Sequence, residues 1–559
     1  MHPRSLLLGL FSLAALAAPA SARPRPPLVD APAIWWDDDR TDLTAPPAYY
    51  EPHLLRYQIH ETLDRPLARH ATPSNLVKTV RAWGGGDRWG EAQNVNALDE
   101  VPNSSWFTNR IGLFPMTMEE LARGAGEGAG PDRGAPWTIV KAKTEGVTPG
   151  FNVKDAAGQV WVVKFDPPGC LGMTTAAGAI SERLLYGAGY NTPCDDAVAF
   201  RREDLVLGDG VRLKDGAVDR AMTEADLDAI LGRLEKDANG RYLAIASKFL
   251  AGKPVGPFDY QGLRDDDPND RVRHEYRREL RGLRVFCAWI THFDTKEHNT
   301  LDMFVEEDGR HFVKHHLIDF ASTLGAGAAG LVQKDGWEYG VNATRILGRL
   351  VTLGLVEDDW RKQRRPPGLP EVGYFGSDPF DPMGFEPLVP NPAFARLTDR
   401  DGYWAAKIIS AFDDEALHAI CAAGKYRDPR ATDYVAATLG QRRDLIARRW
   451  FQRICPVDFF RVEAGKLVAT DLGVARGLWK AESTRYRFRT YAVDAQRRPS
   501  GERPAWTDLA SLSIPIPGGD AAHPFQAFEL RASRDDGDWT PPVVAYVARA
   551  SGRVVAVDR

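Results

Sequence analysis

The octet His-Phe-Asp-Thr-Lys-Glu-His-Asn at residues 292–299 carries three side chains that suit phosphoryl transfer. Asp294 is a carboxylate that could orient or deprotonate a hydroxyl, and Lys296 could neutralise a transferring phosphoryl group. Asn299 adds an oxygen ligand for a divalent cation. By itself this spacing is a weak signal, because about one Asp-x4-Asn pair is expected by chance in a chain of this composition.

Three residues elsewhere in the chain strengthen the signal. Asp319 follows two apolar residues in Leu-Ile-Asp-Phe, where it suits a second metal ligand. Lys164 stands among β-forming residues in Val-Trp-Val-Val-Lys-Phe, where a lone lysine is more often a surface residue with a buried stem. Glu182 follows on a predicted helix, as a lysine–glutamate ion pair would require. Together these residues favour a nucleotide site over an ordinary polar turn.

The elements that must position these residues follow a specific order. The pattern predicts a strand over 137–143, then a turn that contains Gly146 and Gly150, and then a hairpin that ends in the apolar strand of Lys164. A helix is predicted over 174–189, because Ala177, Ile180 and Leu184 share one face.

The octet is framed by a helix and a second hairpin. Residues 241–260 indicate a strand that runs into a Gly/Pro linker, and 274–292 indicate a helix with apolar residues at helical spacing. After the octet, two strands flank an Asp-Gly turn, which is typical of a hairpin. The octet is therefore predicted to be a loop between a buried helix and a hairpin.

This set of motifs resembles the protein-kinase-like fold. The octet is similar to the kinase catalytic loop H-R-D-x-x-x-x-N, Val-Val-Lys-Phe is similar to the lysine motif of the third strand, and Ile-Asp-Phe-Ala is similar to D-F-G. The resemblance covers roughly 137–330 and extends to 455 as a helical lobe. It is closer to the atypical branch, with HipA-type, CotH-type and phosphatidylinositol-kinase-like proteins, because the glycine turn is short, the insert before Asp294 is long and no A-P-E motif occurs.

The resemblance implies a site for ATP and Mg²⁺ (or Mn²⁺). Asp294 would act on the acceptor hydroxyl, with Lys296 beside the γ-phosphate. Lys164 would bind the nucleotide, with Glu182 as its partner. Gly146 and Gly150 would let the backbone approach the phosphates. Asn299 and Asp319 would bind the metal. The segment 246–252 would form the hinge under the adenine.

Three positions depart from the kinase pattern. Phe293 replaces the arginine of H-R-D, which argues against control by a phosphorylated activation loop. Ala321 replaces the glycine of D-F-G, and two glycines replace the usual three in the phosphate turn. None of these changes removes a core polar residue.

The fold class expected is α+β: a two-lobed protein-kinase-like fold with a small C-terminal all-β module. The expected divisions are a signal peptide (1–22), an N-terminal extension or wrapping segment (23–136), an N-lobe (137–260, with an insert at 201–240), a helical C-lobe (261–455) and a β-rich module (456–559).

The first residues predict export. Arg4 precedes an apolar run from Leu6 to Ala18, and Ala-Ser-Ala ends at Ala22, so we expect a cleaved signal peptide and a periplasmic or extracellular protein; an uncleaved anchor is the alternative. No later stretch predicts a transmembrane helix. The net charge of −5 and the 26% of charged residues do not suggest a partner nucleic acid. The five cysteines are too few for a disulfide framework.

Two other functional classes remain open. One is a catalytically silent kinase-fold scaffold or binding protein of the envelope, which the scarcity of nucleotide outside the cytoplasm favours. The other is a same-fold nucleotidyltransferase. The acceptor, a hydroxyl-bearing molecule, is not revealed.

Two further polar stretches have structural explanations. The basic stretch 271–284 could dock an acidic substrate, but a solvated helix face is favoured. His315 and His316 could suggest a metal site, but adjacent strand residues face opposite sides.

Overall fold

The computed structural model describes residues 25–64, 89–126, 130–143, 150–215, 218–327, 330–355, 357–518 and 522–559. The predicted signal peptide and Gly146 lie outside the described residues. The chain divides into two compact units. The larger unit holds Ile34–Gln58 and Glu100–Gln452, and the smaller holds the residues up to Ala33, Ile59–Asp99 and Arg453–Arg559.

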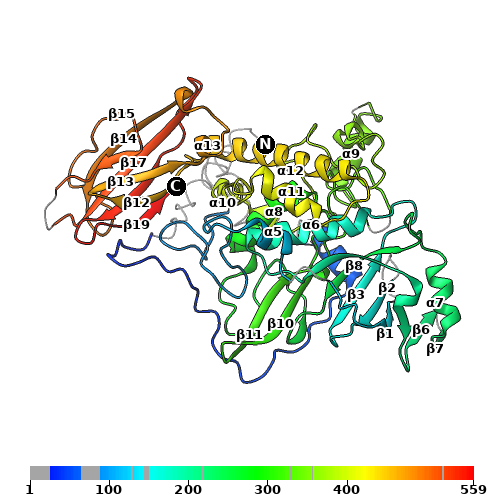
Figure 1. The fold of residues 1–559 in the computed structure, drawn as a ribbon. Coiled ribbons are helices and arrows are strands. Elements are labelled where there is room, and N and C mark those ends of the chain that lie inside the picture. Colours follow the sequence, from blue (N-terminus) through cyan, green and yellow to red (C-terminus); the bar gives the residue numbers. More distant parts are fainter. Residues whose placement is uncertain are drawn as a thin grey trace, which may run out of the picture. The chain divides into compact units, whose positions relative to one another are not determined.

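A six-stranded sheet carries the predicted lysine strand in the larger unit. Its order is β4-β8-β3-β2-β1-β5, and its neighbouring strands run antiparallel except for the parallel pair β1 and β5 (Figure 1). The bounds are β1 (Trp137–Lys143), β2 (Gly150–Lys154), β3 (Val160–Phe165), β4 (Asp195–Phe200), β5 (Leu205–Leu207) and β8 (Tyr242–Lys248).

Side chains along β3 point alternately to the two faces of the sheet, which explains why its lysine points away from the main core. Trp161, Val163 and Phe165 are buried in an aromatic cluster on one face, while Lys164 belongs to the other face and is half-buried. The intermediate exposure of the residues on the second face indicates that this face is partly covered too. The second face is covered by helix α6.

Helix α6 (Met173–Ala188) packs on the sheet through small residues. Ala179 forms a buried cluster with Ala197 of β4 and Ile245 of β8. The helix begins after Gly172, whose φ of 86° favours glycine, and the Asp166 carboxylate accepts hydrogen bonds from the Gly172 and Thr175 backbone amides.

The insert at 201–240 forms its own elements beside this sheet. They are β6 (Arg212–Asp215), β7 (Val218–Ala221) and α7 (Glu224–Leu231). Leu227 and Leu231 of α7 are buried in the aromatic cluster, so the insert completes the core of the sheet.

A second sheet contains the predicted hairpin, with the strand order β11-β10-β9. Its strands are β9 (Lys253–Gly256), β10 (Thr300–Glu307) and β11 (Arg310–Leu317), and β10 and β11 lie side by side (Figure 1). Asp308 and Gly309 at the turn both have positive φ, as a tight two-residue hairpin turn requires. Of the segment 246–252, which was predicted to be the hinge, residues 246–248 belong to β8, and 249–252 connect β8 of the first sheet to β9 of the second.

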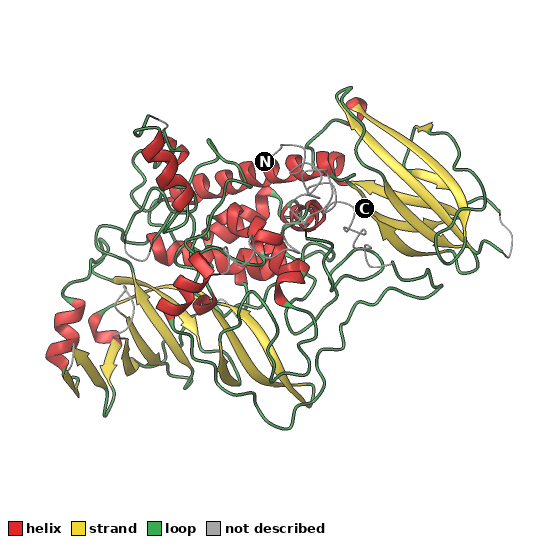
Figure 2. Cartoon of the chain, turned by 180° about the vertical axis from the view of Figure 1, so that it is seen from behind, coloured by secondary structure: helices red, strands yellow, loops and turns green. Residues whose placement is uncertain are grey.

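Helix α8 (Arg278–Ile290) leads into the octet and lies against α10 (Asp399–Ile409). A Cβ at Gly282 would meet the Trp404 ring at 2.9 Å, so glycine permits this close approach. Other helices of this unit are α5 (Met118–Arg123), α9 (Ala343–Val351), α11 (Asp414–Ala422) and α12 (Pro429–Arg453), drawn red in Figure 2. None of the described helices has both the length and the apolar character needed to cross a bilayer.

The segment 34–58 runs as an arm along the second sheet. The Leu43 amide donates to the His311 carbonyl, and the Tyr50 amide donates to the Val255 carbonyl. A Cβ at Gly256 would collide with the Tyr50 backbone, at 2.2 Å from its oxygen. The arm ends in the short helix α2 (Leu54–Ile59).

The smaller unit is built mainly from two antiparallel sheets, β12-β13-β16 and β15-β14-β17-β18-β19 (Figure 1). The strands are β12 (Val457–Glu463), β13 (Lys466–Asp471), β14 (Thr484–Val493), β15 (Thr507–Leu509), β16 (Ser513–Pro515), β17 (Phe525–Arg534), β18 (Val543–Ala548) and β19 (Arg553–Asp558). Apolar residues of both sheets share one buried cluster.

The predicted mixture of helices and sheets is confirmed. The five cysteines are buried free thiols, in agreement with a fold that does not depend on disulfides. The two-lobed arrangement and the predicted domain boundaries stay predictions.

Candidate functional site

The octet forms a tight loop that brings its three polar residues together. Helix α8 ends where Thr291 adopts a left-handed conformation, and one 3-10 turn spans Glu297–Asn299. Within the loop, the Lys296 Nζ lies 2.8 Å from Asp294 Oδ1. The Asn299 amide nitrogen donates to the Asp294 carbonyl at 2.7 Å and to its carboxylate at 3.1 Å. Because the nitrogen of Asn299 is used in this way, its amide oxygen is the atom left to bind a cation.

The register of the β10–β11 hairpin places Asp319 beside this loop. Thr300 pairs with Leu317, and the Ile318 amide donates to the Asn299 carbonyl at 3.0 Å. Asp319 follows with a φ of 63°, a left-handed conformation that costs a non-glycine residue about 1–3 kcal/mol. The Phe320 ring then meets the buried His292 edge to face at 5.9 Å. The octet and the Ile-Asp-Phe-Ala segment are therefore packed against each other.

Lys164 reaches this cluster from the first sheet. Its Nζ lies 3.0 Å from Asp319 Oδ1, and the two side chains are 20% and 40% exposed. Gly150 lies directly opposite Lys164 in the β2–β3 register, as expected for a glycine near the phosphate lysine. The structure thus brings together Lys164, Asp294, Lys296, Asn299 and Asp319, with Gly150 nearby.

Glu182 does not join this cluster, and the prediction that it pairs with Lys164 is wrong. The Glu182 carboxylate is fully buried and accepts hydrogen bonds from the Ala125 amide and the Thr192 hydroxyl. Burial raises the pKa of this carboxyl to about 8, against the opposing effect of the Arg183 charge. Glu182 stands one helical turn after Gly178 and Ala179 and so lies on the same side of α6. Its carboxylate is bonded there by the Ala125 amide and the Thr192 hydroxyl, while Lys164 pairs with Asp319.

Two carboxylates near the cluster were missed by sequence reasoning. Burial raises the pKa of Asp195 to about 7, with Lys164 lowering it and Asp319 raising it further. Burial also raises the pKa of Asp335 to about 6, and the charge of Asp294 adds to that rise. Asp195 stands at the start of a strongly apolar strand, a signal that could have drawn attention to it. Asp335 lies in an irregular segment that offered no signal.

The arm also touches the octet. The Tyr57 ring lies against the His298 ring at 5.6 Å, and the Glu297 amide donates to the Tyr57 hydroxyl at 3.4 Å. The catalytic-loop candidate is therefore supported from outside by a segment more than 200 residues earlier in the chain. Sequence reasoning described this segment only as a linker or a wrapping arm.

The donor set of Asn299 and Asp319 suits a hard cation. An amide oxygen and a carboxylate are ligands that Mg²⁺ accepts, and such sites commonly use one or two protein ligands together with phosphates and water. Among the described residues no group of three or more His, Cys, Asp or Glu side chains could hold a metal by itself. His315, for example, binds Asp302 at 2.6 Å and stacks on Trp106 at 3.5 Å, so it has the structural role that was predicted.

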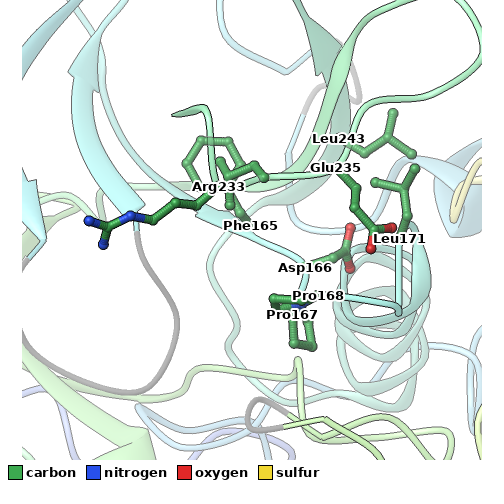
Figure 3. Close-up of a pocket in the computed structure, with 9 residues that line it drawn as sticks. Phe165, Asp166, Pro167, Pro168, Leu171, Arg233, Glu235 and Leu243 are labelled. Carbon is green, nitrogen blue, oxygen red and sulfur yellow. The ribbon is translucent and has the colours of Figure 1, made fainter. Parts of the chain in front are cut away.

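A cavity near β3 is separate from this cluster. It is lined by residues that include Phe165, Asp166, Leu171 and Glu235, and Figure 3 shows the Arg233 side chain pointing away from the others. Phe165 faces away from Lys164, since consecutive strand residues point to opposite sides. The cavity holds about 10 Å³, enough for roughly one water molecule and far too little for a nucleotide.

Comparisons with known proteins add two partial similarities. No protein-family model and no curated protein matches the sequence. The crystal structure of a Helicobacter pylori proinflammatory kinase, CtkA, is 11% identical, and the match covers 56% of this chain and 98% of that chain with a TM-score of 0.27. The crystal structure of the golgi casein kinase is 9% identical, covering 58% and 74% of the two chains with a TM-score of 0.28. At these values neither similarity carries an argument, so the function proposed below rests on the residues themselves.

Proposed function

We propose that this chain is an exported kinase-like phosphotransferase that moves the γ-phosphoryl group of ATP to a hydroxyl acceptor. The observation that supports it is the direct contact between predicted motifs from distant parts of the sequence. Lys164 binds Asp319, Asp319 follows the residue that bonds Asn299, and Asn299 bonds Asp294. Lys164, Asp294, Lys296 and Asp319 also stay partly exposed, which is expected of polar residues that meet a ligand.

The geometry suggests a role for each residue. Asp294 accepts the proton of the acceptor hydroxyl. The oxygen of that hydroxyl bonds to the γ-phosphorus, while the bond from the γ-phosphorus to the ADP oxygen breaks. Lys296, held 2.8 Å from Asp294, offers positive charge to the transferring group. Lys164 binds the phosphates. Asn299 and Asp319 would hold Mg²⁺, which supplies charge neutralisation when bound.

Export is the part of the proposal that rests on sequence alone. The apolar run and the Ala-Ser-Ala site of residues 1–22 support cleavage after Ala22 and release into the periplasm or the medium. The mature chain from Arg23 is therefore the form to purify and test.

The first experiment measures nucleotide binding by thermal shift of the mature chain, with millimolar ATP and either MgCl₂ or MnCl₂. A metal-dependent rise in melting temperature is expected, since a ligand that binds the folded state stabilises it. Lys164→Ala and Asp319→Ala should lose the rise. Lys154→Ala is the matched control, because Lys154 is an exposed lysine on the neighbouring strand β2.

One observation favours a second candidate, a catalytically silent envelope scaffold. In the Lys164–Asp319 pair, the predicted phosphate ligand and the predicted metal ligand neutralise each other. ATP that gives no shift with either metal would support the scaffold and reject the phosphotransferase. If ATP binds, product analysis separates the reactions: ADP indicates phosphoryl transfer, whereas AMP with pyrophosphate indicates nucleotidyl transfer.

A further inference from the structure

Helix α9 turns its apolar side to solvent. An ordinary surface helix does the opposite: it buries its apolar stripe and exposes its polar one. Figure 1 draws α9 at the margin of the larger unit. In this helix and the turn after it, the following apolar side chains, which we call the α9 face, are between 49% and 87% exposed: Ile346, Leu347, Leu350, Val351, Leu353 and Leu355.

The polar side of α9 is the side that the rest of the unit holds. The Arg349 guanidinium lies 2.6 Å from Glu338 and 2.8 Å from Asp358, and that of Arg345 lies 3.4 Å from Asp358. The Glu338 and Asp358 side chains are only 6% and 12% exposed. Leu347 stands two positions from each arginine, so it lies on the opposite side of the helix. These ion pairs therefore fix α9 with its apolar side outward.

The α9 face is suited to a membrane surface. Exposed apolar patches of neighbouring side chains mark sites where a protein meets another protein or a membrane. The nine residues of α9 are too few to cross a bilayer, which requires about 20. A short amphipathic helix can instead lie in the plane of the membrane surface, with its apolar side in contact with the acyl chains.

Basic residues follow the α9 face directly. Residues 338–365 contain six Arg and Lys side chains against four Asp and Glu side chains, in a chain whose net charge is −5. Arg361 stands in the short turn that comes after Asp358, the partner of α9. Arg361 and Arg364 are exposed, and within the described part of the chain neither forms an ion pair with a carboxylate. Their charge is therefore available to an anionic surface.

A second copy of the chain is a poorer partner for this surface. In a two-fold dimer the same patch meets itself, so the arginines that follow α9 would be brought toward the arginines of the partner copy. Like charges placed together across an interface oppose binding. An anionic lipid surface satisfies both parts, because its acyl region accepts the apolar residues and its head groups attract the arginines.

We infer that the α9 face, together with Arg361 and Arg364, docks this protein on an anionic membrane surface. Docking would hold the chain at the lipid surface without a segment that crosses it. The inference goes beyond the proposed function and does not depend on it, since none of these residues belongs to the candidate site.

The first test measures sedimentation of the mature chain with lipid vesicles in the absence of nucleotide. The wild type should sediment with phosphatidylcholine vesicles that contain about one third phosphatidylglycerol, and its bound-to-free ratio should fall about fivefold or more with phosphatidylcholine alone. Leu347→Glu and Leu350→Glu, made singly, should each lower the ratio on the anionic vesicles about tenfold or more. Leu445→Glu is the matched control, because Leu445 is an exposed leucine of another helix, α12.

A second set of variants tests the charge. Arg361→Glu combined with Arg364→Glu should remove the preference for anionic vesicles, whereas Arg310→Glu, a change at an exposed arginine of β11, should keep it. All of these variants should melt near the temperature of the wild type, because each replaced side chain is exposed. If a change within α9 lowers the melting temperature, Leu353→Glu replaces it, since Leu353 follows the helix and is 87% exposed.

Wild-type protein that stays unbound with anionic vesicles would overturn the inference, and so would Leu347→Glu protein that binds as tightly as the wild type. Light scattering without lipid gives a further outcome. A dimer that Leu347→Glu converts to a monomer would overturn the inference as well, because the α9 face would then belong to a second copy. Nucleotide binding is measured separately by thermal shift, so failure of the docking inference and failure of the proposed function are distinguishable.

Discussion

Two charged clusters in the larger unit hold their charges in opposite ways. We call the first the α8 network, which consists of Asp270, His274, Arg277, Arg278, Glu279, Arg281 and Asp401. The second is the candidate site of Lys164, Asp294, Lys296, Asn299 and Asp319. Ion-paired side chains of the α8 network are at most 3% exposed, whereas those of the candidate site are 19% to 40% exposed.

The α8 network shares its charges among several partners. Asp401 lies 3.3 Å from the Arg278 Nε and 3.4 Å from an Arg281 nitrogen, and Asp270 is shared between His274 and Arg277. These contacts raise the pKa of His274 and lower that of Asp270, against the effect of burial on each. Removing one partner would leave a buried charge without compensation.

The candidate site is different because its ion-paired groups remain partly exposed to solvent. Lys164 contacts the Asp319 carboxylate directly. Phosphates could replace Asp319 as the partner of Lys164, and a cation could replace Lys164 as the partner of Asp319. Burial and shared partners therefore mark charges that hold the fold together. Partial exposure and replaceable partners mark charges that are available to a ligand.

The largest effect is expected at Asp294. Asp294→Asn should lower ATP turnover by about 10²- to 10⁴-fold, the usual contribution of a general base. It should change the free energy of unfolding by less than about 0.5 kcal/mol, because the amide keeps an acceptor for the Asn299 nitrogen. ADP formation and thermal melting measure the two quantities. Asp308→Asn at the exposed hairpin turn is the control, and unchanged turnover in Asp294→Asn would remove Asp294 from the reaction.

The α8 network should show the reverse behaviour. Asp401→Ala should lower the free energy of unfolding by about 3–5 kcal/mol, because it removes the carboxylate that two buried arginines share. Urea unfolding followed by tryptophan fluorescence measures the loss. Asp228→Ala is the matched control, because this exposed aspartate pairs with Arg202 at the surface and should cost less than about 1 kcal/mol. Similar losses of unfolding free energy in Asp401→Ala and Asp228→Ala would contradict the structural role of the α8 network.

The buried carboxyl of Glu182 should make the stability of the protein depend on pH. Its pKa is raised to about 8 in the folded protein, so the unfolded chain releases this proton first and stability falls as pH rises from about 4.5 to about 8. Glu182→Gln should reduce that fall, by an amount on the order of a few kcal/mol. Melting curves of the wild type and Glu182→Gln at several pH values test this expectation. Glu203→Gln, a change at an exposed glutamate, is the control. An identical pH slope in wild type and Glu182→Gln would contradict the burial argument.

The smallest effect is expected at Lys164 in the absence of ligand. Lys164→Ala should change the free energy of unfolding by less than about 1 kcal/mol, because its ion pair is partly exposed. The same variant should lose the ATP-dependent thermal shift. A loss of several kcal/mol without ligand would instead place Lys164 with the α8 network, among charges that hold the fold.

Local features of the site could be predicted because they depend on neighbours in the chain. The alternation of β3 put Lys164 on the face opposite Trp161 and Phe165, and the Asp-Gly pair specified the β10–β11 turn. The four residues between Asp294 and Asn299 suffice for one tight loop, and the structure has that loop. Of the predicted glycine turn, residues 144–149 with Gly146 lie outside the described residues, so the role of Gly146 stays a prediction, whereas Gly150 is the first residue of β2.

Predictions that needed distant contacts were less successful. The stretch 271–284 was expected to be a solvated helix face, but Arg277, Arg278 and Arg281 are buried. Asp401, the partner of Arg278 and Arg281, is more than 100 residues away in the chain, so no local pattern could reveal it. The arm residue Tyr57, which meets the octet, has the same long-range character.

The residue types and their spacing can be read from the chain alone: a lysine in an apolar strand, an Asp-x4-Asn loop and an aspartate after a hairpin. Which of these residues meet depends on the packing of distant segments. Glu182 had the right spacing, but its carboxylate is bonded by the Ala125 amide and the Thr192 hydroxyl, and Lys164 pairs with Asp319 instead. Spacing along a chain limits which contacts are possible, and only packing between distant segments selects among them.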